Sequence, residues 1–128
     1  MNEPTSEIEA FNPAWLMESC GEDEAAIREL IGLFVTQATG LWSDLVRAVG
    51  GSDWGTAARV AHKMAGSCGA CGLPALERAL RDFETAAAAG PAPGPWPEVI
   101  RQAARAADAL NSRFKVGWTP RPEGSGKA

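Results

Sequence analysis

Residues 22–49 read EDEAAIRELIGLFVTQATGLWSDLVRAV. Apolar residues recur in this stretch every three or four positions, as they do on one face of an amphipathic helix: Ile27, Leu30, Ile31, Phe34, Ala38, Leu41, Leu45 and Val49. The acidic residues at its start suit the positive end of a helix dipole, and Gly50-Gly51 is a typical helix end. The stretch therefore predicts the longest helix of the chain.

The residues on either side predict further helices and no strands. Alanine and leucine dominate, β-branched residues are few, and no two-residue alternation persists. We expect helices over 13–19, 54–68, 74–89 and 97–116, with Asn12-Pro13 and Ser52-Asp53 starting two of them. The predicted fold is all-α: an antiparallel four-helix bundle with a short extra N-terminal helix and disordered termini.

The chain has the size of one domain. At 128 residues it can bury a single core. We expect residues 1–12 to be a flexible N-terminus, residues 13–116 to form the bundle, and residues 117–128 to be a disordered tail on which Trp118 is a candidate to dock. Because all four bundle helices lie in one chain, a monomer is the simpler expectation.

Charge and hydropathy exclude two classes of partner. The formal net charge is −4 and no run of lysine and arginine occurs, so nucleic-acid binding is not expected. No apolar run approaches the ~20 residues of a membrane span, and the first residues are acidic and polar, unlike a signal peptide. We therefore expect a cytoplasmic protein without a membrane segment.

The three cysteines, Cys20, Cys68 and Cys71, do not form a disulfide framework, because their number is odd and sparse. Cys68-Gly-Ala-Cys71 has redox-motif spacing and could supply two metal ligands beside His62. No second pair of cysteine or histidine residues is present to complete a tetrahedral site. We therefore expect small core residues and no metal site, with metal binding and thiol chemistry as the alternatives.

His62 is the only histidine of the chain and lies within a predicted helix. On a helix that advances about 100° per residue, Gly55, Gly66 and Gly69 fall within roughly 45° of it. Each glycine costs about 1 kcal/mol relative to alanine in a helix interior. One explanation is access: a folded partner can approach an imidazole nitrogen that accepts and returns a phosphoryl group. The alternative is an incidental surface histidine at a glycine-rich helix end.

The helix around His62 is locally positive in a net-acidic chain. Residues 54–76 contain no aspartate or glutamate but include Arg59 and Lys63. Positive groups here would screen an attached phosphoryl group and steer the helix toward an acidic partner. Arg59, one turn before His62, is the better candidate for the close partner, whereas Lys63 lies about 100° round the helix. The alternative is that both are ordinary solvated charges.

The chain resembles the histidine-containing phosphotransfer (HPt) domain family of two-component phosphorelays. The resemblance lies in Ala61-His62-Lys63-Met64-Ala65-Gly66-Ser67, then Gly72, Leu76, Leu80 and Phe83-Glu84, and in Phe34 within Leu-Phe-Val-Thr-Gln. Members look like His-x-x-Lys-Gly-Ser followed by a second glycine, a leucine and a Leu-Glu pair at helical spacing. Over roughly residues 15–110, the helix order and second glycine make the resemblance fairly specific.

The resemblance implies roles for individual residues. His62 would be the phosphoacceptor through Nε2, and Gly66 would leave room for the partner and the phosphoryl group. Ser67 would hold local geometry by hydrogen bonding, and Gln37 on the neighbouring long helix would orient the ring through its other nitrogen. Ala65 departs from the pattern, because the family has lysine there. Either Arg59 or Lys63 compensates, or transfer is slower or restricted to one partner.

The implied function is a phosphorelay intermediate. His62 would take a phosphoryl group from an aspartyl phosphate on a receiver domain and pass it to another, with a hybrid sensor kinase and a response regulator as partners. The receiver would supply Mg²⁺, so the chain would need no cofactor. We expect a shuttle without autokinase activity. A kinase dimerisation domain fits less well, because no acidic residue adjoins His62 and no Thr-Pro follows. The remaining alternative is a degenerate HPt module that binds a receiver without transfer.

Overall fold

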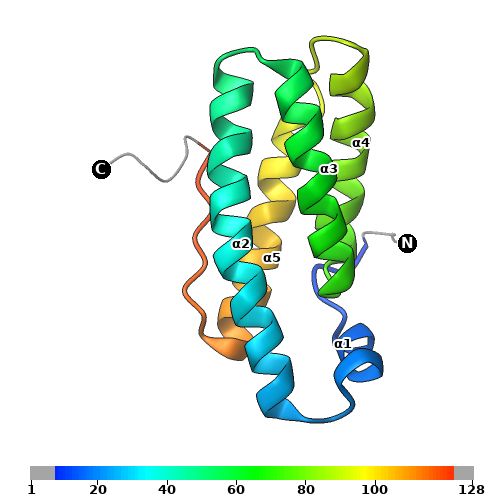
Figure 1. Cartoon of the computed structure of the whole chain (residues 1–128), viewed down its shortest axis with the longest axis vertical. Coiled ribbons are helices and arrows are strands. Elements are labelled where there is room, and N and C mark those ends of the chain that lie inside the picture. The colour runs from blue at the N-terminus through cyan, green and yellow to red at the C-terminus, as the bar shows by residue number, and fades with distance from the viewer. Residues whose placement is uncertain (1–7, 123–128) are drawn as a thin grey trace, which may run out of the picture.

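The computed structural model describes residues 8–122, and within them the regular structure is entirely helical. The helices are α1 (Pro13–Cys20), α2 (Glu24–Gly50), α3 (Trp54–Ala70), α4 (Pro74–Ala89) and α5 (Trp96–Phe114). The four long helices alternate in direction, and α1 lies across one end (Figure 1). The predicted all-α bundle with a short extra N-terminal helix is confirmed.

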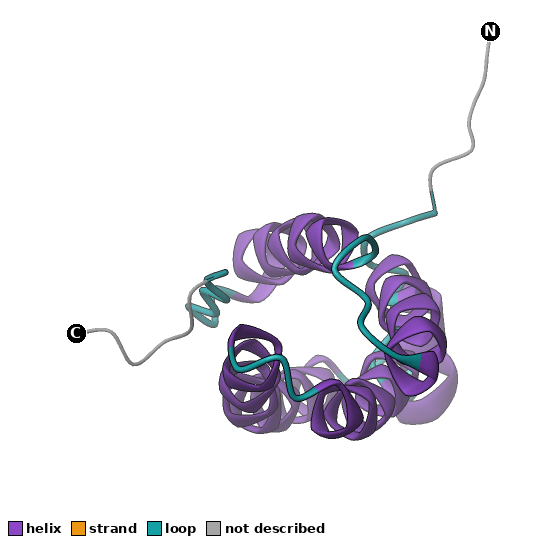
Figure 2. Ribbon diagram, turned by 90° about the horizontal axis from the view of Figure 1, so that it is seen from above, coloured by secondary structure: helices purple, strands orange, loops and turns teal. Residues whose placement is uncertain are grey.

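The long helices enclose one common core of buried side chains, and Figure 2 shows the arrangement of these helices seen from above. Helix α3 packs against both α2 and α4, α4 also packs against α5, and α1 rests on α2. On α3 the buried side chains are mostly small: Ala57, Ala58, Ala61, Met64, Ala65 and Cys68. Small side chains let helix backbones approach closely, so residues on the flanks of α3 lie within reach of both neighbours.

Side-chain caps fix where three helices begin. Asn12 Oδ1 accepts from the Ala14 N–H at 3.0 Å, and Asp23 Oδ1 accepts from the N–H groups of Ala25 and Ala26. Asp53 Oδ1 accepts from the Thr56 N–H at 3.2 Å. These bonds satisfy donors that the first helical turn leaves unpaired. Asp23 is therefore the cap of α2 and not part of its first turn.

Several predicted helix ends are shifted by one or two residues. Helix α3 continues to Ala70, two residues beyond the predicted end at Cys68. Helix α5 begins at Trp96, with Pro97 inside its first turn, and ends at Phe114 instead of Val116. Lys115 adopts the left-handed conformation, with φ 56° and ψ 47°, and its N–H donates to the Asn111 carbonyl. A residue in this conformation closes a helix.

Glu9 and Asn12, in the stretch predicted to be a flexible N-terminus, are hydrogen-bonded to the start of α4 and to the turn before it. The Asn12 N–H donates to the Gly72 carbonyl at 2.8 Å, and the Glu9 carbonyl accepts from the Ala75 N–H at 3.1 Å. Gly72 has φ +74°, and a Cβ there would lie 2.6 Å from the Asn12 oxygen. Glycine at this turn therefore lets the N-terminal segment dock on the α3–α4 connection. Residues 1–7 lie outside the described residues.

Residues 117–122, where the predicted C-terminal tail begins, contact the bundle. Trp118 is 3% exposed and meets the Phe34 ring edge-on, with 5.4 Å between centroids. The amide of Asn111 bonds both the N–H and the carbonyl of Trp118, at 2.9 and 2.8 Å. The Trp42 Nε1–H donates to the Arg121 carbonyl at 2.7 Å. Residues 117–122 thus lie along the bundle beside α2 (Figure 1), whereas residues 123–128 are not described.

No helix within residues 8–122 is both long enough and apolar enough to cross a membrane.

Candidate functional site

His62 lies near the middle of α3, on the edge between core and solvent. Its side chain is 65% exposed. Ala61 and Ala65 are buried, whereas Lys63 and Gly66 are exposed. The imidazole therefore stands at the surface, on the flank that the helical periodicity predicts.

A carboxylate on α4 contacts the ring. Nδ1 of His62 lies 2.9 Å from Oε2 of Glu84. Because an ionised carboxylate only accepts hydrogen bonds, this contact places a hydrogen on Nδ1 and leaves the lone pair on Nε2. The nitrogen free to act as a nucleophile is thus Nε2, on the side of the ring away from Glu84.

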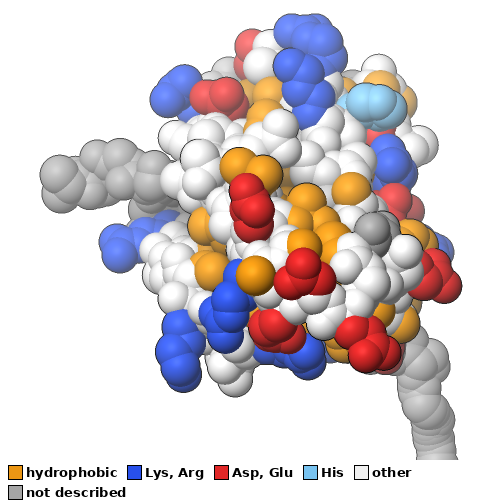
Figure 3. All heavy atoms as spheres, turned by 60° about the horizontal axis from the view of Figure 1, so that its bottom comes forward, with side chains coloured by type: hydrophobic (Ala, Val, Ile, Leu, Met, Phe, Trp, Pro, Cys, Tyr) orange, Lys and Arg blue, Asp and Glu red, His pale blue; other side chains and the backbone are white. Residues whose placement is uncertain are grey.

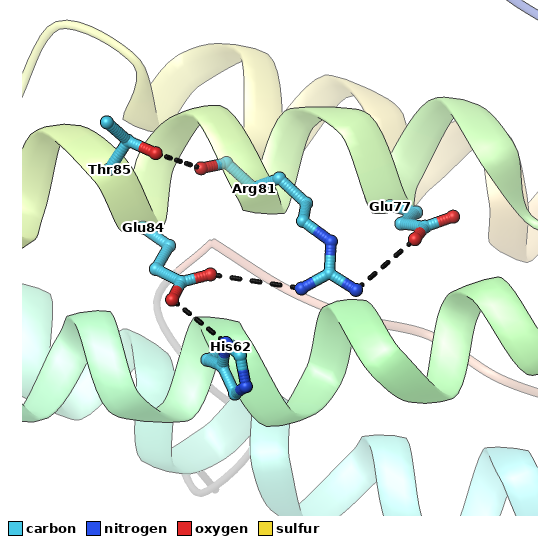
Figure 4. Close-up of polar contacts among 5 residues, drawn as sticks. All are labelled: His62, Glu77, Arg81, Glu84 and Thr85. Atoms are coloured by element: carbon cyan, nitrogen blue, oxygen red, sulfur yellow. Dashed lines mark hydrogen bonds and ion pairs between the residues drawn. The ribbon is translucent and has the colours of Figure 1, made fainter.

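Glu84 belongs to a row of charged residues on α4. Arg81 Nη1 lies 4.0 Å from Glu84 Oε1, and Arg81 Nη2 donates to Glu77 Oε2 at 3.3 Å. Figure 4 shows these side chains on α4 facing α3, with the His62 ring below Glu84. Acid and base alternate along the row, so the charge of Glu84 is partly offset by Arg81.

The ring is thus less positively surrounded than the sequence of α3 alone indicates. The absence of aspartate and glutamate holds for residues 54–76, but α4 brings Glu84 to His62. The only sequence signal for Glu84 was the Phe83-Glu84 pair in the resemblance, which does not say what Glu84 faces.

Arg59 and Lys63 share one open hollow with the ring. This hollow has a volume of about 580 Å³ and is lined by Gly55, Ala58, Arg59, His62, Lys63, Glu84 and Ala88. The Arg59 guanidinium donates to Thr56 Oγ1 at 3.1 Å, which holds it along the helix. Two cations and small side chains beside an exposed ring leave space for a negatively charged group.

The glycines near His62 do not all serve access. At Gly55 and Gly66 an added Cβ would meet no atom within 4 Å, so the surface there is open. At Gly69 an added Cβ would lie 3.0 to 3.1 Å from the carboxylate of Glu77. Gly69 therefore makes room for a side chain of this chain's own α4.

The expected contact between Gln37 and the ring is absent from the described structure. Gln37 Oε1 instead accepts from Ser67 Oγ at 2.8 Å, which joins α2 to α3. Ser67 follows His62 by five residues, which turns it about 140° away on the helix. One side of α3 thus presents Ser67 to α2 while the other presents His62 to α4. Glu84, and not Gln37, contacts the second ring nitrogen.

Ala65, where the resemblance leads one to expect lysine, is fully buried. The position faces the core, so only the end of a long side chain could reach the surface from it. Both candidates for the missing cation, Arg59 and Lys63, line the hollow with His62.

Cys68 and Cys71 are core residues and do not line the hollow around His62. Cys68 and Cys71 are buried, and burial raises the pKa of the Cys71 thiol to about 11 and that of Cys68 well above its ordinary value. Both are therefore neutral thiols near pH 7. Within residues 8–122 no group of three or more histidine, cysteine, aspartate or glutamate residues is placed to hold a metal ion.

Comparison with known proteins identifies the family. Residues 29–112 match the model of the Hpt domain, and this range contains α3, α4 and most of α2 and α5. Neither the curated proteins nor the solved structures include a significant match. Because the matched range is more than half of the chain, the protein belongs to the Hpt domain family, whose members are phosphotransfer modules of two-component phosphorelays and not kinases, with response-regulator receivers as partners.

Proposed function

We propose that this protein is a phosphorelay intermediate whose phosphoacceptor is Nε2 of His62. The observation that carries the proposal is the exposed ring with Nδ1 held 2.9 Å from Glu84. Because Nδ1 is hydrogen-bonded to a carboxylate, the ring keeps one tautomer and one orientation, and Nε2 stays available while a partner docks.

The transfer conserves atoms and charge. The Nε2 lone pair attacks the phosphorus of a receiver's aspartyl phosphate, an N–P bond forms, and the O–P bond breaks with its electron pair leaving on the aspartate carboxylate. The proton on Nδ1 stays hydrogen-bonded to Glu84, which stabilises the positive charge that develops on the ring. Attack by the aspartate of a second receiver reverses these steps. The Mg²⁺ that offsets the phosphoryl charge belongs to the receiver.

The receiver approaches, in this proposal, over the end of the bundle that carries α1. Trp15, Met17 and Leu33 are large exposed apolar side chains there, with exposed fractions of 51, 42 and 63%. Leu33 also lines an open hollow of about 430 Å³, together with residues that include Gln37 and Ser67. Figure 3 shows hydrophobic side chains gathered in the middle of this face and the histidine to one side of them. Exposed apolar patches of this kind mark protein interfaces.

The wider setting is part of the proposal. We place the protein in the cytoplasm as a monomer, between a hybrid sensor kinase that phosphorylates its own receiver and a separate response regulator. The net charge of −4 and the one-chain bundle support a small soluble carrier.

The test is incubation with a receiver that carries a radiolabelled aspartyl phosphate. Wild-type protein should acquire an acid-labile, base-stable label, and His62→Gln should acquire none while keeping its helical circular dichroism. Equal labelling of His62→Gln would reject His62 as the acceptor. A wild-type protein that binds the receiver but takes no label would instead be the non-transferring module.

A further inference from the structure

We propose that Arg81 is a positioning residue for the phosphoacceptor, acting through Glu84. The proposal rests on the proposed function in taking His62 as the acceptor, but its geometric content concerns only the ring and α4. Arg81 does not touch the imidazole. Its effect passes through the carboxylate that does.

The two oxygens of Glu84 have different partners. Oε2 contacts Nδ1 of His62 at 2.9 Å, and Oε1 faces Arg81 Nη1 at 4.0 Å. A carboxylate held at both oxygens has one orientation, whereas a carboxylate held at one oxygen can turn about its side-chain bonds. Arg59 and Lys63 line the same hollow and offer Glu84 other cations to turn toward. Arg81 therefore keeps Glu84 directed at the ring.

Arg81 is itself held from its other side. Its Nη2 donates to Glu77 Oε2 at 3.3 Å, and Glu77, Arg81 and Glu84 follow one another at spacings of four and three residues on one face of α4. The pairs are half-exposed, and exposed ion pairs are individually weak. The ion pairs of Arg81 with Glu77 and Glu84 therefore matter more for the orientation of the Glu84 carboxylate than for the stability of the protein.

The antiparallel packing of α3 on α4 explains why Gly69 belongs to the same arrangement. Gly69 follows His62 by seven residues, and Glu77 precedes Glu84 by seven, so the two contacts repeat two helical turns apart. The Glu77 carboxylate lies where a side chain of residue 69 would begin. Glycine at this position thus lets Glu77 rest against α3 and receive Arg81.

The consequence for transfer is electrostatic as well as geometric. A phosphoryl group on Nε2 would share its surroundings with the negative charge of Glu84. Arg81 partly offsets this charge without contacting the phosphoryl group. The row therefore lets a carboxylate fix the tautomer while it reduces repulsion of the phosphoryl group.

The test measures the tautomer of His62 at alkaline pH from its ring nitrogen chemical shifts. Since the chain has a single histidine, the signals need no assignment. Arg81→Ala should lower the ratio of the Nδ1–H to the Nε2–H form by about two- to fivefold and slow phosphotransfer by a similar factor. Arg81→Lys should recover part of both changes, because it restores the charge but not the fork.

Arg78→Ala is the matched control. Arg78 lies one turn before Arg81 and pairs with Asp82 at 3.5 Å. The Arg78→Ala substitution should leave the tautomer ratio and the transfer rate at wild-type values. Equal effects of Arg78→Ala and Arg81→Ala would overturn the proposal, because only a general loss of positive charge would then be at work.

Gly69→Ala is a second test, because a structural role and a positioning role of Gly69 predict different results for the tautomer ratio. Alanine favours a helix over glycine, so a purely structural role predicts equal or higher stability and an unchanged ring. We expect the new methyl group to displace the Glu77 carboxylate and to lower the tautomer ratio without loss of thermal stability. An unchanged ratio in both Gly69→Ala and Arg81→Ala would refute the positioning role even if His62 takes the label. A lowered ratio in a protein that never takes the label would refute the proposed function alone.

Discussion

Arg59 and Lys63 lie in the same hollow as His62, one helical turn apart on the same side of α3. Arg59 precedes His62 by three residues and lies about 60° from it on the helix, whereas Lys63 lies about 100° away. The bond from Arg59 to Thr56 holds the guanidinium along the helix at 3.1 Å and reduces the side-chain freedom that it must lose on meeting a phosphoryl group. Of the two cations, Arg59 is the better placed.

We therefore expect Arg59→Ala to slow transfer from a phosphorylated receiver by about fivefold and Lys63→Ala by less than about twofold. Rapid-quench measurement of the labelled protein gives both rates. Rising salt should narrow the difference, because both side chains are exposed and their charges are screened. The reverse ranking would identify Lys63 as the cation that replaces the lysine missing at Ala65.

At the scale of the helix, the sequence predicts where α2, α3 and α4 lie but not which residues they bring together. Apolar periodicity and caps such as Asp23 and Asp53 are local signals, so they can be read from one stretch. Whether His62 meets Gln37 or Glu84 depends on how α3 is rotated between its two neighbours. That rotation follows from packing of small side chains across interfaces, which single-stretch patterns do not contain. The closing contacts of Trp118 and Asn12 are likewise long-range.

Because α3 is open to solvent at Gly66, a substitution there can change receiver docking without changing the fold. An added side chain there meets no atom within 4 Å, so Gly66→Leu should fold normally and gain up to about 1 kcal/mol of helix stability. The leucine would project beside His62 into the space that a receiver needs. We expect transfer to fall by more than about tenfold. Gly66→Ala is the control, with a much smaller effect on transfer and a similar gain in melting temperature. Normal transfer by Gly66→Leu would mean that receivers do not approach over this turn.

At the scale of the whole molecule, the buried thiols couple stability to alkaline pH. Burial raises the pKa of Cys71 from 9.0 to about 11. Between these values the unfolded chain releases a proton that the folded chain keeps, so the free energy of unfolding falls as pH rises. The stability that the protonated Cys71 thiol contributes is fully present below about pH 9 and is lost as the pH rises to about 11. Urea unfolding at several pH values should show a smaller alkaline decline in Cys71→Ala than in wild type. Equal slopes would mean that the Cys71 thiol is not protected from ionisation in the folded protein.

Two buried tryptophans, Trp42 and Trp118, hold residues 117–122 against the bundle. Trp42 is 2% exposed and Trp118 is 3% exposed, but only the Trp42 indole has a bond to the described residues, its Nε1–H donating to the Arg121 carbonyl at 2.7 Å. Asn111 holds Trp118 by its backbone. A change to phenylalanine removes similar volume at both sites, but at Trp42 it also leaves a carbonyl without its donor.

We expect Trp42→Phe to lower the free energy of unfolding by about 1 kcal/mol more than Trp118→Phe does. At Trp118 the substitution removes a buried N–H that has no partner among residues 8–122, so the loss of packing is partly offset. Urea unfolding followed by circular dichroism at 222 nm measures both variants. A Trp118→Phe variant that is the less stable of the two would show that packing of the Trp118 indole, and not the bond from Trp42 to Arg121, dominates how this segment is held.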